Sequence, residues 1–177
     1  MQKNLVAVVT IRKGSQRVKN KNFRLFAKKN LLKHKIEVLQ KVKNLDDIII
    51  NTDSEEAIQI AKDYGVSFEK RENYYASDEC SNSDFWENIA KNTKSKYILF
   101  THCTNPIIEV KTYDNIIKIF EETKNKNDSI NTVSEVKEFL YLENKPLNFN
   151  PEKAPGSQDL PNIVKLNFAI NILTTEL

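Results

Sequence analysis

Residues 12–24 concentrate positive charge around a glycine and a serine, a combination suited to binding anions. Gly14 lets backbone N–H groups approach an anion closely, and the Ser15 hydroxyl adds another donor. Arg12 and Lys21 bracket the stretch, so their side chains are placed to neutralise a polyphosphate. We therefore predict an anion-binding loop here, with a solvated basic loop as the open alternative. The cations of the stretch are Arg12, Lys13, Arg17, Lys19, Lys21 and Arg24.

The distribution of charge along the chain favours a focused anion site over a general nucleic-acid surface. Residues 1–36 contain eleven Lys or Arg and no Asp or Glu, although the net charge of the whole chain is only +3. No aromatic-bearing sheet or recognition helix is evident, so no nucleic-acid partner is expected. Arginine is scarce, and where it occurs a planar bidentate donor suits phosphate better than lysine does. The four arginines are Arg12, Arg17, Arg24 and Arg71.

Length and composition indicate one globular domain. The 177 residues, 40% of them hydrophobic, can bury a core without disulfides or metals. No apolar run approaches the roughly 18 residues that span a bilayer, so no membrane anchor is expected. The run 5–11 is short and ends in two basic residues, which favours a buried strand over a secretory signal. Cys80 and Cys103 are therefore expected as free thiols of a cytoplasmic protein.

The hydrophobic pattern alternates between strand and helix periodicity. Ser54 is a typical helix N-cap followed by two acids, and Gly65 is placed to end that helix. Alternation through residue 136 predicts an α/β fold: a Rossmann-like, mostly parallel sheet with helices on both faces. Strands are expected at 5–11, 47–52, 66–69, 97–101, 129–136 and 163–173, and helices at 31–42, 54–65, 84–92 and 112–124.

Residues 137–162 interrupt this alternation, as an insertion in a single domain of residues 1–177 would. The apolar segments 139–142 and 147–149 flank a polar turn and predict a β-hairpin. The three prolines that follow, in residues 150–162, predict a loop before the last strand.

In an open α/β sheet, ligands bind outside the carboxyl ends of the strands. The loops expected at that edge are 12–22, 51–54, 71–82 and 102–106. The predicted fold therefore gathers the basic loop and three other polar loops at one edge of the sheet.

The order of residues in the basic loop resembles the signature of the acylneuraminate cytidylyltransferases, the CMP-sialic acid synthetases and their relatives. That signature runs Ala-Arg-x-Gly-Ser-x-[Gly/Arg]-[Ile/Val]-x-x-Lys-Asn. Ile11 replaces the usual Ala, and Lys19 stands where Pro is common. The Lys-Asn ending differs from the Lys-Pro of sugar-1-phosphate nucleotidyltransferases. The residues that match in register are Arg12, Gly14, Ser15, Arg17, Val18, Lys21 and Asn22.

Further segments resemble the same family in order and spacing over residues 5–173. Residues 102–106 occupy the place of the family's Gln-Pro-Thr-Ser-Pro-Leu-Arg, of which only Thr104 and Pro106 remain, and Ile108 stands where Arg is usual. The other similar segments are Asn51–Glu56, Arg71 with Ala76–Asp78 and Ser81, Thr132–Glu135, and Asn167–Ile170.

The resemblance implies that a sugar-acid hydroxyl attacks the α-phosphate of CTP with Mg²⁺ present, and that pyrophosphate leaves. Arg12 and Lys21 would be the catalytic cations. The sugar acid would meet His102, Thr104, Lys165 and Asn167. The product would serve the synthesis of bacterial surface glycans. The nucleotide would be bound by Arg12, Gly14, Ser15, Lys21, Asn22, Arg71, Ser81 and Asn82.

Two departures bear on this implied function. The altered 102–108 segment leaves the identity of the acceptor open. The family also carries an Asp-x-Asp metal pair beyond the last strand, whereas the sequence ends at Leu177, so the Mg²⁺ ligands are unknown. The alternative hypothesis is a truncated or decayed relative that binds CTP without turnover. The insertion resembles the family's dimerisation element, and apolar Phe139–Leu142 predict a homodimer.

Several other residues have structural interpretations. His102 is either a hydrogen-bonded loop residue or an acceptor contact, and no second pair is spaced to make a zinc site with it. His34 is expected on a helix surface and Cys80 as an ordinary loop thiol. Phe85 and Trp86 are expected in the core. Asp53 either caps the following helix or belongs to the site.

Overall fold

The computed structural model describes residues 3–14 and 18–176. The chain divides into two compact units, which are described separately. The first unit comprises residues 1–130 and 169–177, and the second unit comprises residues 131–168. The second unit encloses the insertion expected at 137–162 and extends beyond it on both sides.

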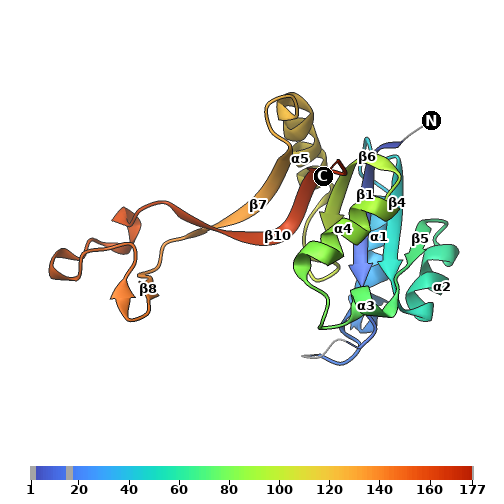
Figure 1. The fold of residues 1–177 in the computed structure, drawn as a ribbon, viewed down its shortest axis with the longest axis horizontal. Coiled ribbons are helices and arrows are strands. Elements are labelled where there is room, and N and C mark those ends of the chain that lie inside the picture. The colour runs from blue at the N-terminus through green and yellow to red at the C-terminus, as the bar shows by residue number, and fades with distance from the viewer. Residues whose placement is uncertain (1–2, 15–17, 177) are drawn as a thin grey trace. The chain divides into compact units, whose positions relative to one another are not determined.

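The main sheet has the strand order β5-β4-β1-β6-β10-β7. Its parallel strands are β1 (Lys3–Ile11), β4 (Asp47–Thr52), β5 (Ser67–Lys70) and β6 (Ser95–Thr101), which stand in this arrangement in Figure 1. β10 (Ile163–Thr174) is antiparallel to β6 and pairs Ile170 with Thr101. β7 (Ser129–Val136) is the edge strand beside β10. The mostly parallel α/β sheet confirms the predicted fold class.

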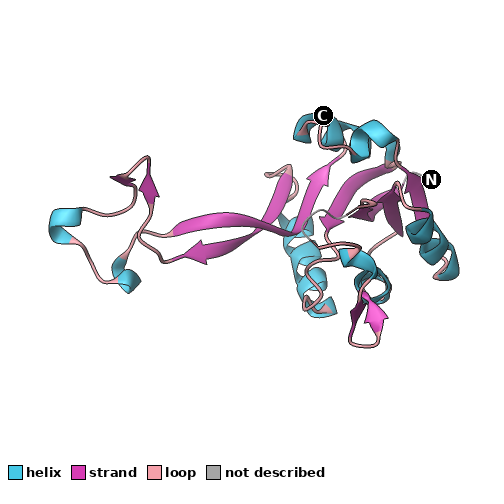
Figure 2. Cartoon of the chain, turned by 90° about the horizontal axis from the view of Figure 1, so that it is seen from below, coloured by secondary structure: helices cyan, strands magenta, loops and turns pink. Residues whose placement is uncertain are grey.

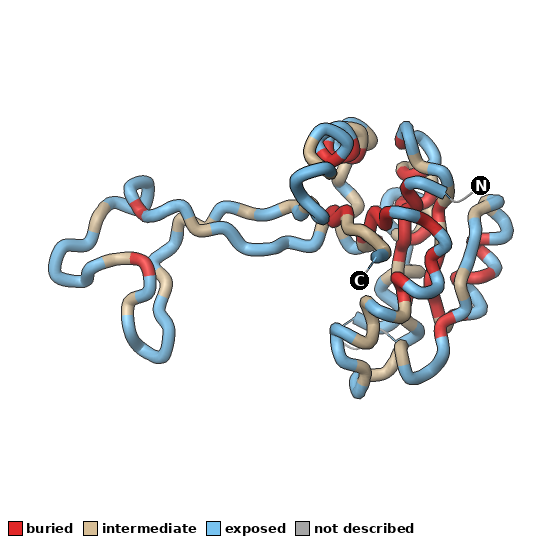
Figure 3. Tube along the Cα trace, turned by 45° about the horizontal axis from the view of Figure 1, so that its top comes forward, coloured by how far each residue is buried: buried red, intermediate tan, exposed pale blue. Residues whose placement is uncertain are grey.

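Alternate residues of β1 point to opposite faces, and helices cover both. On one face, Leu5, Ala7, Val9 and Ile11 pack against α1 (Leu31–Leu39), α2 (Glu55–Asp63) and α5 (Val110–Thr123). On the other, Val6 and Val8 pack with Ile98 and Phe100 against α4 (Asn82–Asn92). Figure 3 shows the buried residues following these strands.

Some elements differ from the sequence-based expectation. α1 ends at Leu39, earlier than expected, and a helical turn, α3 (Asn73–Ala76), lies inside the expected polar loop. Residues 12–30 also contain a short 3-10 helix, η1 (Lys21–Phe23), and a hairpin of β2 (Leu25–Phe26) and β3 (Lys29–Asn30). The hairpin turn uses Ala27 and Lys28 at positive φ, so it lacks the Asn or Gly that marks such turns in a sequence.

The second unit has little regular structure besides its portions of β7 and β10, the two long strands visible in Figure 2. The predicted hairpin is present but shorter, with β8 (Tyr141–Leu142) and β9 (Lys145–Pro146) joined at Glu143 and Asn144, both at positive φ. Asn148 is buried and bonds the backbone of Leu140 and Glu138, which fixes the base of the hairpin. Two 3-10 turns follow, η2 (Pro151–Lys153) and η3 (Ser157–Asp159).

None of the helices in the described part of the chain combines the length and hydropathy needed to cross a membrane.

Candidate functional site

A cavity of about 220 Å³ opens between the end of β1 and the α3–α4 segment. Arg12 enters it from the first loop, and Arg71 enters it from the residue that follows β5. Two guanidinium groups in one cavity make it a site for an anion. Its lining residues are Arg12, Arg71, Tyr75, Ala76, Ser77, Cys80, Asn82 and Phe85.

Arg12 lies between this cavity and a second one of about 290 Å³. Its Nη1 donates to Asp78 Oδ1 at 2.6 Å and to the Ala76 carbonyl at 3.4 Å. The Asp78 side chain is two-thirds exposed, and such a solvent-facing pair contributes little to stability. Arg12 can therefore exchange this partner for a ligand phosphate at small cost. The second cavity is lined by Arg12, Lys13, Gly14, Asn20, Phe23, Asp53, Ser54, Glu55 and Glu56.

Arg71 is buried and tied to two strand ends. Its Nε donates to Asn51 Oδ1 at 2.7 Å, and its Nη2 donates to the carbonyls of Asn51 at 2.7 Å and Ile11 at 3.3 Å. Burial lowers the pKa of Arg71 to about 10, so the group stays charged at neutral pH. The guanidinium also lies over the Phe85 ring, 5.4 Å from its centroid. Arg71 therefore forms a rigid, charged floor of the cavity.

The first loop is anchored to the end of β4 through Asp53. The Lys13 N–H donates to Asp53 Oδ1 at 2.7 Å, while Ser54 caps α2 by accepting from the Ala57 N–H at 3.4 Å. Ser54 is thus the cap that the sequence predicted, and Asp53 positions the loop. Gly14 has a φ of +79°, a conformation that favours glycine. Ser15 and Arg17, predicted from the sequence, lie outside the described residues.

Lys21 and Asn22 lie on η1, where Lys21 is exposed and Asn22 is half-buried. Burial lowers the pKa of His102, and the positive charges of Lys21 and Lys35 lower it further. His102 is therefore mainly neutral at pH 7, with its ring edge-on to Phe100 at 4.8 Å.

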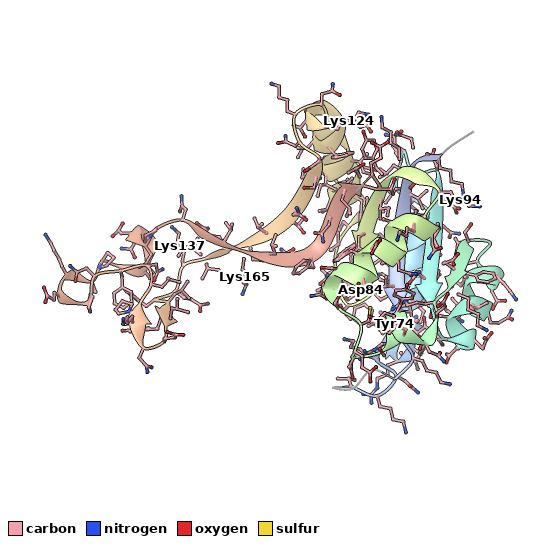
Figure 4. All side chains as sticks on the ribbon, viewed as in Figure 1. Tyr74, Asp84, Lys94, Lys124, Lys137 and Lys165 are labelled. Carbon is pink, nitrogen blue, oxygen red and sulfur yellow. The ribbon has the colours of Figure 1, made fainter. Side chains whose placement is uncertain are left out.

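Ser81 and Asn82 begin α4. The Ser81 hydroxyl accepts from the Asp84 N–H at 3.1 Å, so this side chain is the helix N-cap. Tyr74 of α3 donates its hydroxyl to Asp84 Oδ2 at 2.9 Å, and Figure 4 labels both residues. These bonds join α3 to α4. Asn82 lines the cavity with the two arginines.

The loop after β6 lines its own open hollow of about 320 Å³, formed by Thr104, Asn105, Pro106, Ile107 and Ile108. Its base is held by α1, which sequence reasoning missed. His34 was expected on the surface, but it is half-buried and its Nε2 lies 2.8 Å from the Pro106 carbonyl. Lys35 is buried beside it. In the sequence, the available signal was that Lys35 occupies a position on the apolar face of the predicted helix.

Lys165 and Asn167, the other predicted acceptor residues, belong to β10 in the second unit. Both are exposed, and Figure 4 labels Lys165 on this strand. Asn167 is bonded across to β7, accepting from Thr132 Oγ1 at 2.7 Å and donating to Ser134 Oγ at 3.0 Å.

Within residues 3–14 and 18–176, no three His, Cys, Asp or Glu side chains are grouped closely enough to hold a metal ion. Mg²⁺ that accompanies a nucleotide is held by one or two carboxylates together with substrate phosphates, so the expected Mg²⁺ stays a prediction.

The amino-acid sequence was compared with known protein families and proteins. Residues 6–162 match the family described as "Cytidylyltransferase". An N-acylneuraminate cytidylyltransferase of Escherichia coli O18:K1:H7 is 33% identical over 85 residues, which cover 48% of this chain and 20% of that protein. A CMP-N,N'-diacetyllegionaminic acid synthase of Campylobacter jejuni is 37% identical over 75 residues, covering 42% and 32%. The matched residues thus cover less than a third of the length of either relative.

Among solved structures, a CMP:2-keto-3-deoxy-manno-octonic acid synthetase complexed with CTP superposes with a TM-score of 0.74. The superposition covers 98% of this chain and 75% of that one, at 14% identity. At this identity the likeness shows the fold.

Proposed function

The chain belongs to the cytidylyltransferase family, and from this premise we propose that it transfers CMP from CTP to a sugar acid of the sialic or nonulosonic type. The acceptor hydroxyl would form a bond to the α-phosphorus and lose its proton, while the bond to the β-phosphate breaks and pyrophosphate leaves. The observation that carries the proposal is the cavity in which Arg12 and Arg71 converge beside Asn82.

The residues of the first loop are proposed to stabilise the charge that develops on the leaving pyrophosphate. The Arg12 side chain is 34% exposed and its ion pair with Asp78 faces solvent, so its guanidinium can turn to a phosphate. Lys21 supplies a second cation on η1. Groups fixed before the reaction stabilise such charge without reorganising, and no protein nucleophile is required. Gly14 and the described backbone around it would approach the phosphates.

The base and ribose are proposed to lie over Arg71 and Asn82. Arg71 is locked by Asn51 and Ile11, so it presents a fixed charged plane. His102 and Thr104 are proposed to contact the acceptor. Since the pKa of His102 is lowered, its ring would act as a neutral hydrogen-bonding partner. The sugar-acid class is supported by the names of the E. coli and C. jejuni relatives.

The wider role is part of the same proposal. We propose that the CMP-sugar feeds bacterial surface glycans, that the enzyme acts in the cytoplasm, and that Mg²⁺ accompanies CTP. Cys80 and Cys103 are free thiols, in keeping with a reducing compartment. We further propose a homodimer formed through the second unit, since Tyr141, Leu142 and Leu147 there are each more than half exposed.

The test measures nucleotide binding and turnover separately. Calorimetry should show that CTP binds at least tenfold more tightly than ATP. Arg12→Ala should weaken CTP binding, whereas Lys118→Ala, at an exposed position of α5, should not. Pyrophosphate release with Mg²⁺ is then measured with N-acetylneuraminic acid, N,N'-diacetyllegionaminic acid and 2-keto-3-deoxy-manno-octonic acid. Equal binding of ATP would refute the nucleotide assignment. CTP binding without pyrophosphate release from any acceptor would favour the alternative, a binding module without turnover.

A further inference from the structure

Lys35 is a buried cation that no carboxylate neutralises among the residues described. Its side chain is 1% exposed on the inner face of α1, between Leu32 and Ile36. Burying an ammonium group without partners costs free energy. The hydrogen-bond partners of Lys35 therefore indicate which part of the structure it supports. Its Nζ donates to the Tyr113 hydroxyl at 2.6 Å and to the Asn105 carbonyl at 3.1 Å.

The donors in this cluster can be assigned by counting hydrogens. Thr101 Oγ1 has one proton and donates it to the Ala169 carbonyl at 2.8 Å. The Tyr113 hydroxyl, 3.0 Å from Thr101 Oγ1, must therefore be the donor in that contact. Burial raises the pKa of Tyr113 to about 12, so this hydroxyl keeps its proton. The free lone pair of Tyr113 then faces Lys35, which fixes the ammonium group in one direction.

The loop after β6 receives the remaining bond of Lys35 and a second bond from the residue beside it. Lys35 holds the Asn105 carbonyl, and His34 Nε2 lies 2.8 Å from the Pro106 carbonyl. Two consecutive residues of α1 thus hold two consecutive carbonyls of one loop. The His34 ring also packs edge-on against Phe26 at 5.8 Å, which restricts its orientation.

We propose that Lys35, together with His34, is a positioning residue that fixes the 102–106 loop for the sugar-acid acceptor and leaves CTP binding unaffected. This inference rests on the proposed function, in which His102 and Thr104 of that loop meet the acceptor. The hydrogen bonds of Lys35 run to this loop and to α5. The cavity of Arg12 and Arg71 has none of these groups in its lining. Loss of the two bonds should therefore loosen one substrate subsite and spare the other.

The kinetic test compares four variants with the wild type. Lys35→Met removes the charge at similar length, and His34→Leu removes the ring nitrogen. His34→Gln keeps an N–H that can reach the Pro106 carbonyl, and Lys33→Met is the matched control on the same helix. We expect the acceptor KM to rise at least fivefold in Lys35→Met and His34→Leu, with the CTP KM within twofold. His34→Gln and Lys33→Met should behave like the wild type.

An equal rise in both KM values, or no rise in either, would overturn the proposal. If Lys35→Met does not fold, the comparison of His34→Leu with His34→Gln decides whether the proposal holds. His34 is only half-buried, so its replacement should leave the core intact. Unchanged CTP affinity by calorimetry verifies folding in each variant.

Hydrogen–deuterium exchange separates this inference from the proposed function. Peptides covering residues 102–109 should exchange faster in Lys35→Met and His34→Leu than in the wild type, while peptides covering β1 should not change. This measurement needs no turnover. If the wild type binds CTP but releases no pyrophosphate, the proposed function fails, and the exchange result still decides whether α1 holds the loop. Unchanged protection of residues 102–109 would refute the positioning role.

Discussion

Arg71 and Asn51 are joined by two hydrogen bonds that leave the same edge of one guanidinium group. Arg71 Nε donates to the Asn51 side chain and Arg71 Nη2 to the Asn51 backbone carbonyl, both at 2.7 Å. A third bond reaches Ile11 on the neighbouring strand. The segment after β5 is thereby fixed to the carboxyl ends of β4 and β1. Arg71 therefore helps to fix the geometry of the cavity proposed to bind the nucleotide.

Replacing Arg71 by Lys should destabilise the protein and weaken CTP binding. A lysine offers a single charged point and cannot bond the Asn51 side chain and backbone as a planar fork does. We expect Arg71→Lys to lower the free energy of unfolding by about 1–3 kcal/mol, measured by urea denaturation. Arg24→Lys is the control, because Arg24 is exposed and the one described hydrogen bond of its side chain goes to the Lys19 carbonyl. Equal stability of the two variants would contradict the assigned role of Arg71.

Arg12 should show the opposite balance between stability and binding. Its pair with Asp78 is solvent-facing, so Arg12→Ala should change the free energy of unfolding by less than about 1 kcal/mol. CTP affinity, measured by calorimetry, should fall at least tenfold because a phosphate partner is lost. Asp78→Asn should leave CTP affinity equal or higher, since it removes a competing carboxylate. A loss of affinity in Asp78→Asn would argue that Asp78 itself serves the ligand.

Cys80 should report occupancy of the cavity through its reaction with a thiol reagent. Cys80 is partly exposed and lines the cavity with Arg12 and Arg71. Cys103 is buried, and burial raises the pKa of its thiol to about 12, so it should not react in the folded protein. We expect one thiol to be labelled by mass spectrometry, and saturating CTP to slow its labelling at least fivefold. Labelling unaffected by CTP would place the nucleotide elsewhere.

Lys35 should make stability depend on alkaline pH. Burial lowers its pKa from 10.5 to about 8, so between these values the unfolded chain binds a proton that the folded chain has released. The free energy of unfolding then rises with pH by about 1.4 kcal/mol per unit from this group. Cys103 and Tyr113, whose raised pKa values act in the opposite sense, are present in both proteins compared. The wild type minus Lys35→Met difference should therefore rise between pH 8 and 10.

Lys33→Met, on the same helix, is measured as the control across the same pH range. Urea denaturation at half-unit pH intervals provides both curves. A flat difference for Lys35→Met would show that Lys35 is not desolvated in solution.

Dimerisation through the second unit should be sensitive to charge at its apolar surface. Leu142 is 62% exposed on β8, and a glutamate there would have to be desolvated in an interface. We expect Leu142→Glu to shift sedimentation velocity profiles from dimer to monomer. Leu25→Glu in the first unit is the matched control, since Leu25 is 84% exposed and should leave the dimer intact. A monomeric wild type at micromolar concentration would contradict the predicted homodimer.

Periodicity was enough to predict the sheet and its covering helices. The run of β-branched residues from Leu5 to Ile11 is buried along its length, and Ser54 caps α2 as its position after a strand indicated. The order of residues in the basic loop was sufficient to suggest the family, because a phosphate loop needs particular residues at fixed spacing. The short hairpin at Ala27 and Lys28 was not predictable, since its turn residues carry no conformational signal.

The sequence by itself determined the fold class, the family and the cations of the first loop, because these depend on local patterns of residue type. The tertiary structure decided which side chains those cations meet. Two nitrogens of Arg71 donate hydrogen bonds to Asn51 and Ile11, whereas Arg12 donates to Asp78, whose side chain faces solvent. Only the fold brings His34 and Lys35 to a loop some 70 residues away. Contacts at such separation depend on packing around the whole core, which local spacing does not encode.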